Sequence, residues 1–179
     1  MLKVVEKSQT LPLTLEEVKI HLRLETPEED QYLLHLIETA TEYIEEYLNR
    51  SLIIQKLCYT SQGIKKQNGL FDVRLFRPNI IQVDKVTLIR ANVGRFIVKR
   101  YQLIETESVP KLTLAKEESD FVEVIYDSGY GYYPKNIPSP IRHALLHLVA
   151  DFYENRGEES VIRSDFFKNL LHPYRVLEI

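Results

Sequence analysis

The segment that most constrains the fold spans residues 126–157, where an alternating run passes through a glycine- and proline-rich connection into an amphipathic helix. Val122, Val124 and Tyr126 recur at every second position, which is the periodicity of a β-strand. The glycines that follow permit positive φ, and three prolines keep the connection extended. The pattern therefore predicts a strand that turns sharply and leads into a helix.

The helix that follows is expected over residues 138–157. Ile141, Leu145, Leu148 and Phe152 recur at i, i+4, i+7 and i+11, so they form one apolar stripe along the helix. Gly157 is placed as the residue just beyond the C-terminus, where a left-handed conformation is common. This stripe predicts a buried core helix.

Two further helices are predicted over residues 13–50. Thr14 and Glu17 have the spacing of a capping box, with the first helix continuing to about Leu22. Thr26 and Glu29 repeat that signal, with a proline between them at the first helical position. Because the two helices are joined by only a few residues, we expect them to pack as a helical hairpin.

Residues 52–127 are patterned as strands. Apolar and polar residues alternate in several short runs, and the turn signals at 67–69 and 92–94 are of the kind that close hairpins. The predicted fold class is therefore α+β. An N-terminal helical hairpin and the long C-terminal helix form a helical core, an antiparallel β subdomain of four to six strands is inserted between them, and residues 158–179 form a C-terminal arm.

Composition argues for one ordinary globular domain spanning residues 1–179. The chain has 44% hydrophobic and 27% charged residues, no run long enough for a membrane span and no secretory signal pattern. Cys58 is the only cysteine, so no internal disulfide is possible, and its apolar setting fits a buried small side chain. We expect a cytosolic protein. We also expect no catalytic activity and no cofactor, because the sequence lacks nucleophile-elbow and phosphate-loop motifs.

Charge is unevenly distributed along a chain whose net charge is −3. Residues 1–50 hold five Lys/Arg against eleven Asp/Glu, whereas residues 51–127 hold twelve against nine. A protein that grips DNA phosphates normally presents a basic face, so the acidic helix argues against that role. That helix carries four glutamates that either form a solvated face or line a channel that repels DNA: Glu38, Glu42, Glu45 and Glu46.

Three polar residues of the C-terminal helix have ligand-like spacing. His143, His147 and Asp151 lie at i, i+4 and i+8, and two such histidines can share a zinc ion. The glutamate of a zinc-protease motif is absent between them, and a polar helix face explains the pattern equally well. We expect no metal site, and stoichiometric zinc in the purified protein would support the alternative.

Aromatic residues gather in two places where the sequence leaves little domain to cover them. The tyrosines of the glycine-rich loop can stack on single-stranded bases, pack in the core, or serve as a protein–protein hot spot. The C-terminal arm either folds back or docks on a neighbouring molecule. For the loop we favour a protein interface over base stacking, with one or two of the tyrosines packed in the core. For the arm both outcomes stay open, and we expect truncation after Glu158 to weaken assembly while the rest stays folded. The candidate interface residues are Tyr130, Tyr132, Tyr133, Arg142, Arg156, Phe166, Phe167, Tyr174 and Arg175.

Several segments together resemble the head–tail connector (adaptor) proteins of tailed phages. The segment ending in YENRG is similar to the C-terminal half of that family, and the helices of residues 13–50, the SLIIQ entry to the middle region and LLHPYRV near the end follow in the family's order. The resemblance spans roughly residues 13–175. No motif within it is catalytic.

The resemblance implies a structural function. Copies would form a ring, dodecameric in the virion, that docks on the portal protein and extends the DNA channel toward the tail. The further partners would be a downstream head-completion or tail protein, with DNA only as passing cargo and no membrane. The protein would lie at the virion head–tail junction after assembly in the host cytoplasm, from a phage or a prophage. The alternative is a DNA-binding accessory protein of phage DNA packaging.

Overall fold

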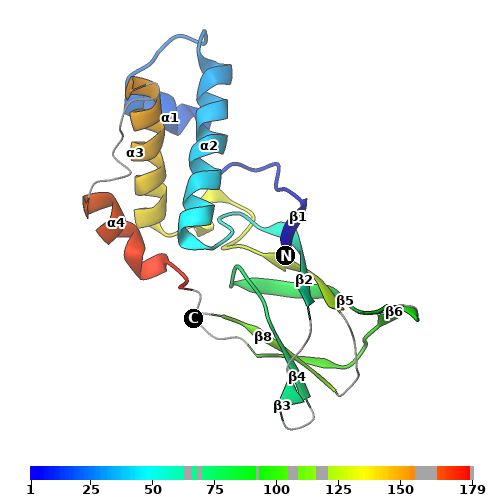
Figure 1. Ribbon diagram of the computed structural model, residues 1–179. Helices are drawn as coiled ribbons and strands as arrows, with labels where there is room; N and C mark the ends of the chain where they lie inside the picture. The colour runs from blue at the N-terminus through cyan, green and yellow to red at the C-terminus, as the bar shows by residue number, and fades with distance from the viewer. Residues whose placement is uncertain are drawn as a thin grey trace. The chain divides into compact units, whose positions relative to one another are not determined.

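The computed structural model describes residues 1–62, 66–67, 70–91, 93–104, 109–115, 121–155 and 165–177 (Figure 1). The chain divides into two compact units, each built from segments far apart in the sequence. The helical unit comprises Gln9–Ile53 and Tyr130–Arg175, and the β unit comprises Met1–Ser8, Ile54–Gly129 and Val176–Ile179.

The helical unit contains four described α-helices. These are α1 (Leu15–Leu22), α2 (Asp30–Leu48), α3 (Ser139–Asn155) and α4 (Asp165–Leu171), with short 3-10 helices η1 (Pro134–Asn136) and η3 (His172–Tyr174). The predicted capping box is confirmed at α1, where the Glu17 amide donates to Thr14 Oγ1 and the Glu17 carboxylate accepts from the Thr14 amide. No described helix has both the length and the apolar character needed to cross a membrane.

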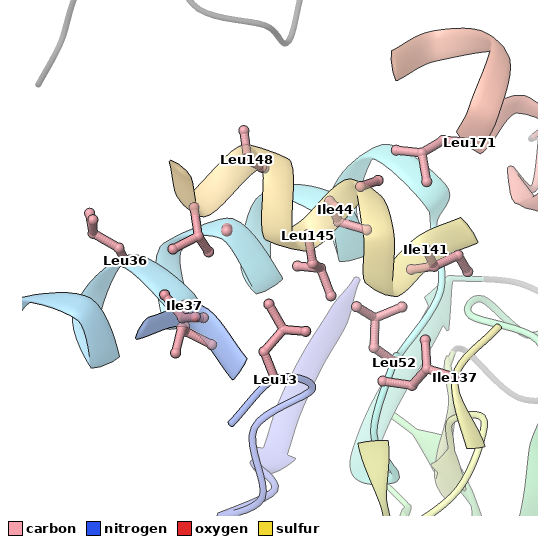
Figure 2. Packing of buried hydrophobic residues seen from close by; sticks show 14 of the residues in the cluster. Leu13, Leu36, Ile37, Ile44, Leu52, Ile137, Ile141, Leu145, Leu148 and Leu171 are labelled. Carbon is pink, nitrogen blue, oxygen red and sulfur yellow. The ribbon is translucent and has the colours of Figure 1, made fainter. Parts of the chain in front are cut away.

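The core of the helical unit lies between α2 and α3, which run side by side (Figure 1). Figure 2 shows Ile44 of α2 and Leu145 and Ile141 of α3 among the packed side chains, each with no exposed surface. Leu171 of α4 belongs to the same cluster and is also fully buried. The apolar stripe predicted for α3 is therefore the face that α3 turns to the core.

The β unit contains nine described strands in two antiparallel sheets. The five-stranded sheet has the order β1-β2-β9-β5-β6, and the four-stranded sheet has the order β3-β4-β8-β7. The strand bounds are β1 (Leu2–Glu6), β2 (Gln55–Gln62), β3 (Lys66–Gln67), β4 (Leu70–Arg74), β5 (Ile80–Arg90), β6 (Gly94–Ile97), β7 (Tyr101–Ile104), β8 (Lys111–Ala115) and β9 (Phe121–Ser128).

The two sheets share one hydrophobic cluster. Val73 and Leu112 of the four-stranded sheet belong to the same buried group as Leu88 and Val124 of the five-stranded sheet. Alternate residues of β8 (Leu112 and Leu114) and of β9 contribute to this group, as expected when two sheets bury one face against each other. Tyr126 has no exposed surface and donates its hydroxyl to the Phe76 carbonyl oxygen at 2.6 Å, so its polar tip is satisfied inside this unit.

The predicted fold class is wrong. The chain begins with a strand, β1, and not with a helical hairpin, and the described strands form two antiparallel sheets instead of one inserted subdomain. β1 pairs with β2 through Leu2–Tyr59 and Val4–Leu57, more than 50 residues along the chain. Sequence periodicity did not reveal this strand, because Leu2–Glu6 has no strict alternation of apolar and polar residues and its pairing partner is distant.

Three further predictions need correction or fall outside the described residues. α2 begins at Asp30, and the predicted start at Thr26 lies in the connection, where the Thr26 carbonyl accepts from Lys19 Nζ at 2.8 Å. The same lysine lies 2.7 Å from Asp30 Oδ1. Gly157, placed as the residue beyond the α3 C-terminus, and both predicted hairpin turns lie wholly or partly outside the described residues.

Candidate protein–protein interface

The glycine-rich loop between β9 and α3 has a defined closure. The Tyr133 amide donates to Asn136 Oδ1 at 3.1 Å, which holds the turn that contains η1. A Cβ at Gly131 would lie 2.4 Å from the Asn136 Cγ atom, so only glycine fits at this position without a shift. The loop is therefore built to hold its side chains in place.

Two of the loop tyrosines are exposed and one is not. Tyr132 and Tyr133 are 61% and 62% exposed, and Lys135 Nζ lies 5.6 Å from the centre of the Tyr133 ring. Tyr130 packs against the helical core, with the Arg50 guanidinium 6.0 Å from its ring centre. Burial raises the pKa of Tyr130, although nearby Arg50 opposes that shift. Tyr132 and Tyr133 remain candidate interface residues, whereas Tyr130 packs the loop against the helical core.

The described part of the C-terminal arm folds back on the helical unit. Phe167 is only 2% exposed, and its ring centre lies 6.4 Å from that of Tyr47 on α2. The Tyr174 carbonyl accepts from Arg50 Nε at 2.6 Å, and the Arg175 guanidinium lies 5.0 Å from the Tyr47 ring centre. Phe167 is thus core and not a partner contact. Arg156 lies outside the described residues, as does the side chain of Phe166.

Arg142 links two helices of the same unit. Its guanidinium pairs with the Glu17 carboxylate, so α3 is tied to the capped N-terminus of α1. Partial burial acts to raise the pKa of Glu17, but the hydrogen bonds with Thr14 and the charge of Arg142 outweigh it, and the pKa is lowered. Arg142 therefore has a structural partner within the chain.

The acidic helix presents three of its four candidate glutamates to solvent. Glu38, Glu42 and Glu46 are exposed on α2, spaced at one helical turn each. Glu45 is only 8% exposed, and its carboxylate accepts from the Leu52 amide at 2.8 Å. Glu45 therefore stabilises the reversal of the chain after α2, and it does not belong to the exposed acidic face.

Three histidines form a cluster on α1 and α3. The Nε2 atoms of His143 and His147 lie 3.0 Å apart, and the ring of His21 meets that of His147 edge-on, with centres 5.4 Å apart. Burial lowers the pKa of His147, and the neighbouring His143 and His21 lower it further. Asp151 is buried at 4% and accepts from Asn155 Nδ2 at 2.8 Å. Within the described residues, no group of three ligands is arranged to hold a metal ion.

A basic surface of the β unit was missed by the sequence reasoning. Residues 85–104 contain five Lys/Arg and no Asp/Glu, a signal that was averaged away when charge was counted over residues 51–127. Arg95, Lys99 and Arg100 are exposed here, at β6 and the segment after it. Exposed apolar side chains lie among them, including Ile97 at 64% exposure.

Comparison with known proteins identifies the family of this chain. Residues 12–163 match the protein family described as Head completion protein. The chain belongs to the head completion protein family. The resemblance to phage head–tail connector proteins that the sequence carries is thereby confirmed. A comparison with curated proteins finds no match.

Solved structures share the fold of this family member over its whole length. A chain from the neck of an empty gene transfer agent particle, computed with C6 symmetry, has a TM-score of 0.83 at 21% identity and covers 100% of this chain and 97% of its own. A chain from the virion of a native gene transfer agent particle has a TM-score of 0.81 at 21% identity, with 100% and 97% covered. A chain from the native particle's neck, computed with C12 symmetry, has a TM-score of 0.79 at 20% identity and the same coverage.

Proposed function

We propose that this head completion protein is a structural, non-catalytic subunit of a phage-like head–tail junction. The observation that carries the proposal is the full-length likeness to chains in gene transfer agent necks, together with the family match over residues 12–163. Those necks were computed with C6 and C12 symmetry. The whole chain, residues 1–179, acts as one connector domain and assembles into a twelve-membered ring in the virion.

In this proposal the ring docks on the portal protein after DNA packaging and extends the DNA channel toward the tail. A downstream head-completion or tail protein binds its other end, and the subunit assembles in the host cytoplasm. A ring subunit needs two different complementary surfaces, because a head-to-tail contact must repeat until the rotation closes. Exposed aromatic side chains such as Tyr132 and Tyr133 fit a contact with the portal or with a neighbouring subunit, since they bury large area with little loss of freedom.

Electron microscopy of the protein mixed with its cognate portal tests the proposal directly. Rings seated coaxially on the portal are expected, and persistent separation of the two proteins at micromolar concentration would contradict it. A Tyr132→Ser/Tyr133→Ser variant should keep its circular dichroism spectrum and lose portal binding, ring formation or both. Tyr32→Ser, a change of an aromatic side chain with 36% exposure on α2, is the matched control and should leave both unchanged.

The second candidate function is DNA binding during packaging, which the basic surface at residues 85–104 favours. DNA binding would appear as an affinity for duplex DNA that falls as salt is added. The slope of log affinity against log salt concentration is set by the number of phosphates contacted. Fluorescence anisotropy of labelled duplex DNA at two salt concentrations measures this. Absence of binding at low salt would leave the structural role as the sole candidate.

A further inference from the structure

We propose that the basic surface of the β unit docks on the acidic face of α2 in a second copy of this chain. This inference rests on the proposed ring, and it names the two complementary surfaces that the ring requires. The basic surface consists of Arg95, Lys99 and Arg100. The acidic face consists of Glu38, Glu42 and Glu46.

Each surface lies in a long stretch of sequence whose charged side chains are of a single sign. Residues 85–104 contain no Asp or Glu, and residues 24–49 contain no Lys or Arg. Across the sheet, Glu123 of β9 places its Oε1 atom 3.5 Å from Nη1 of Arg95, and the Arg95 side chain is still 66% exposed. Most exposed surfaces interleave both signs, because like charges that lie close together repel. Glutamates spaced four residues apart on a helix destabilise it, and Glu46 also lies in the last turn of α2, at the negative end of the helix dipole. A cationic surface laid against this face relieves both costs.

The spacings of the two charge sets agree. Glu38 to Glu46 is eight residues of α-helix, or about 12 Å along the axis. Arg95 to Lys99 is four residues, which span at most about 14 Å when extended. The two charge sets are therefore of similar length, so Arg95 and Lys99 can meet two of the carboxylates in one register.

Apolar groups accompany the charges on both sides. A cavity of about 460 Å³ opens beside β6, lined by Leu88, Phe96, Ile97, Val98 and Leu114 together with Lys99 and Arg100. On α2, Leu34 is 37% exposed and lies one turn before Glu38. Leu34 followed by carboxylates is therefore complementary to an apolar cavity that is bordered by Lys99 and Arg100.

This mixed chemistry favours a protein partner over DNA. Ile97 is 64% exposed and Phe96 is 40% exposed within the basic surface, and the Arg90 guanidinium lies 5.2 Å from the centre of the Phe96 ring. Arginine and aromatic side chains are enriched in protein–protein interfaces. A surface that contacts only duplex phosphates has no use for exposed apolar side chains.

Two charge-reversed variants test the pairing. One carries Arg95→Glu, Lys99→Glu and Arg100→Glu, and the other carries Glu38→Lys, Glu42→Lys and Glu46→Lys. Each alone places like charges in every head-to-tail contact, so its dissociation constant for self-association should rise at least about tenfold. In an equimolar mixture every contact becomes complementary again, and association should return in alternating order. Sedimentation velocity over a concentration series measures both effects, and circular dichroism checks that each variant is folded.

The controls separate this inference from the proposed function. A Lys3→Glu/Lys7→Glu/Lys168→Glu variant has the same net charge as the first variant, changes other exposed residues, and should associate like wild type. If wild type forms rings and both charge-reversed variants do so equally well, the pairing is refuted and the ring stands. If wild type remains monomeric with and without its portal, the ring itself is refuted. If the first variant loses duplex DNA binding while self-association is unchanged, the basic surface belongs to DNA and the pairing is refuted.

Discussion

Replacing Phe167 by alanine should strongly destabilise the helical unit. Phe167 is 2% exposed and lies in the cluster that includes Leu171 of the same helix. Burying a phenylalanine removes roughly 150–200 Å² from water, worth about 4–5 kcal/mol at about 25 cal/mol per Å². Measured Phe→Ala changes in protein cores cost about 3–5 kcal/mol, so we expect a loss of about 4 kcal/mol. Urea unfolding followed by circular dichroism at 222 nm measures this, because the helices dominate that signal.

Tyr133→Ala is the matched control for this substitution. It removes an aromatic ring that is 62% exposed, and the free energy of unfolding should change by no more than about 0.5 kcal/mol. A loss below about 1 kcal/mol for Phe167→Ala would show that the arm is not held against the helices in solution. The burial also revises the expectation for truncation after Glu158: removing Phe167 and Leu171 should destabilise the helical unit as well as any assembly.

Three further outcomes follow from the helical unit. Leu145→Asp puts a carboxylate at a site with no exposed surface, so the variant should lose several kcal/mol or fail to fold, and a wild-type urea midpoint would contradict this. The pKa of His147 is lower in the folded state than the ordinary value of 6.5 that it has in the unfolded chain. The contribution of neutral His147 to the free energy of unfolding is therefore complete above pH 6.5 and is lost as the pH falls below that value. His147→Asn should therefore lose less stability than wild type between pH 7.5 and 5.5, and equal losses would refute the role of this side chain. Gly131→Ala should destabilise the loop by about 1–3 kcal/mol through its clash with Asn136, and adding Asn136→Gly, which removes the clashing Cβ, Cγ and Oδ1 atoms, should recover part of the loss in thermal unfolding.

Local signals in the sequence predicted the helices better than they predicted the connections and the sheets around them. The capping box at Thr14 and the apolar stripe of α3 are confirmed, because both depend on residues within one or two turns of each other. The start of α2 was misplaced at Thr26 because the same capping pattern can stand in a connection, where Lys19 holds it instead. Antiparallel pairing of the middle region is also observed, although in two sheets.

Long-range contacts decided what the sequence could not show. Glu45 was grouped with the exposed glutamates, yet it shares the i, i+4, i+7 face of Thr41 and Leu48, which are buried. Its burial requires a partner seven residues on, the Leu52 amide, and no helical period predicts that contact. Phe167 was assigned to a docking arm for the same reason, since the surface that covers it comes from elements about 120 residues earlier and from α3.

Buried and exposed side chains separate the residues that stabilise the fold from those that we propose for assembly. The aromatic residue of the arm that is buried, Phe167, stabilises the helical unit, whereas Tyr132 and Tyr133 are exposed on a loop closed by its own hydrogen bond. The acidic face of α2 lies opposite the stripe that packs on α3, so its charges can change without disturbing the core. A ring subunit benefits from this separation, because each copy can fold fully before it meets a neighbour. Variants of the exposed sets should therefore fail in assembly while unfolding like wild type, and variants of the buried set should fail in both.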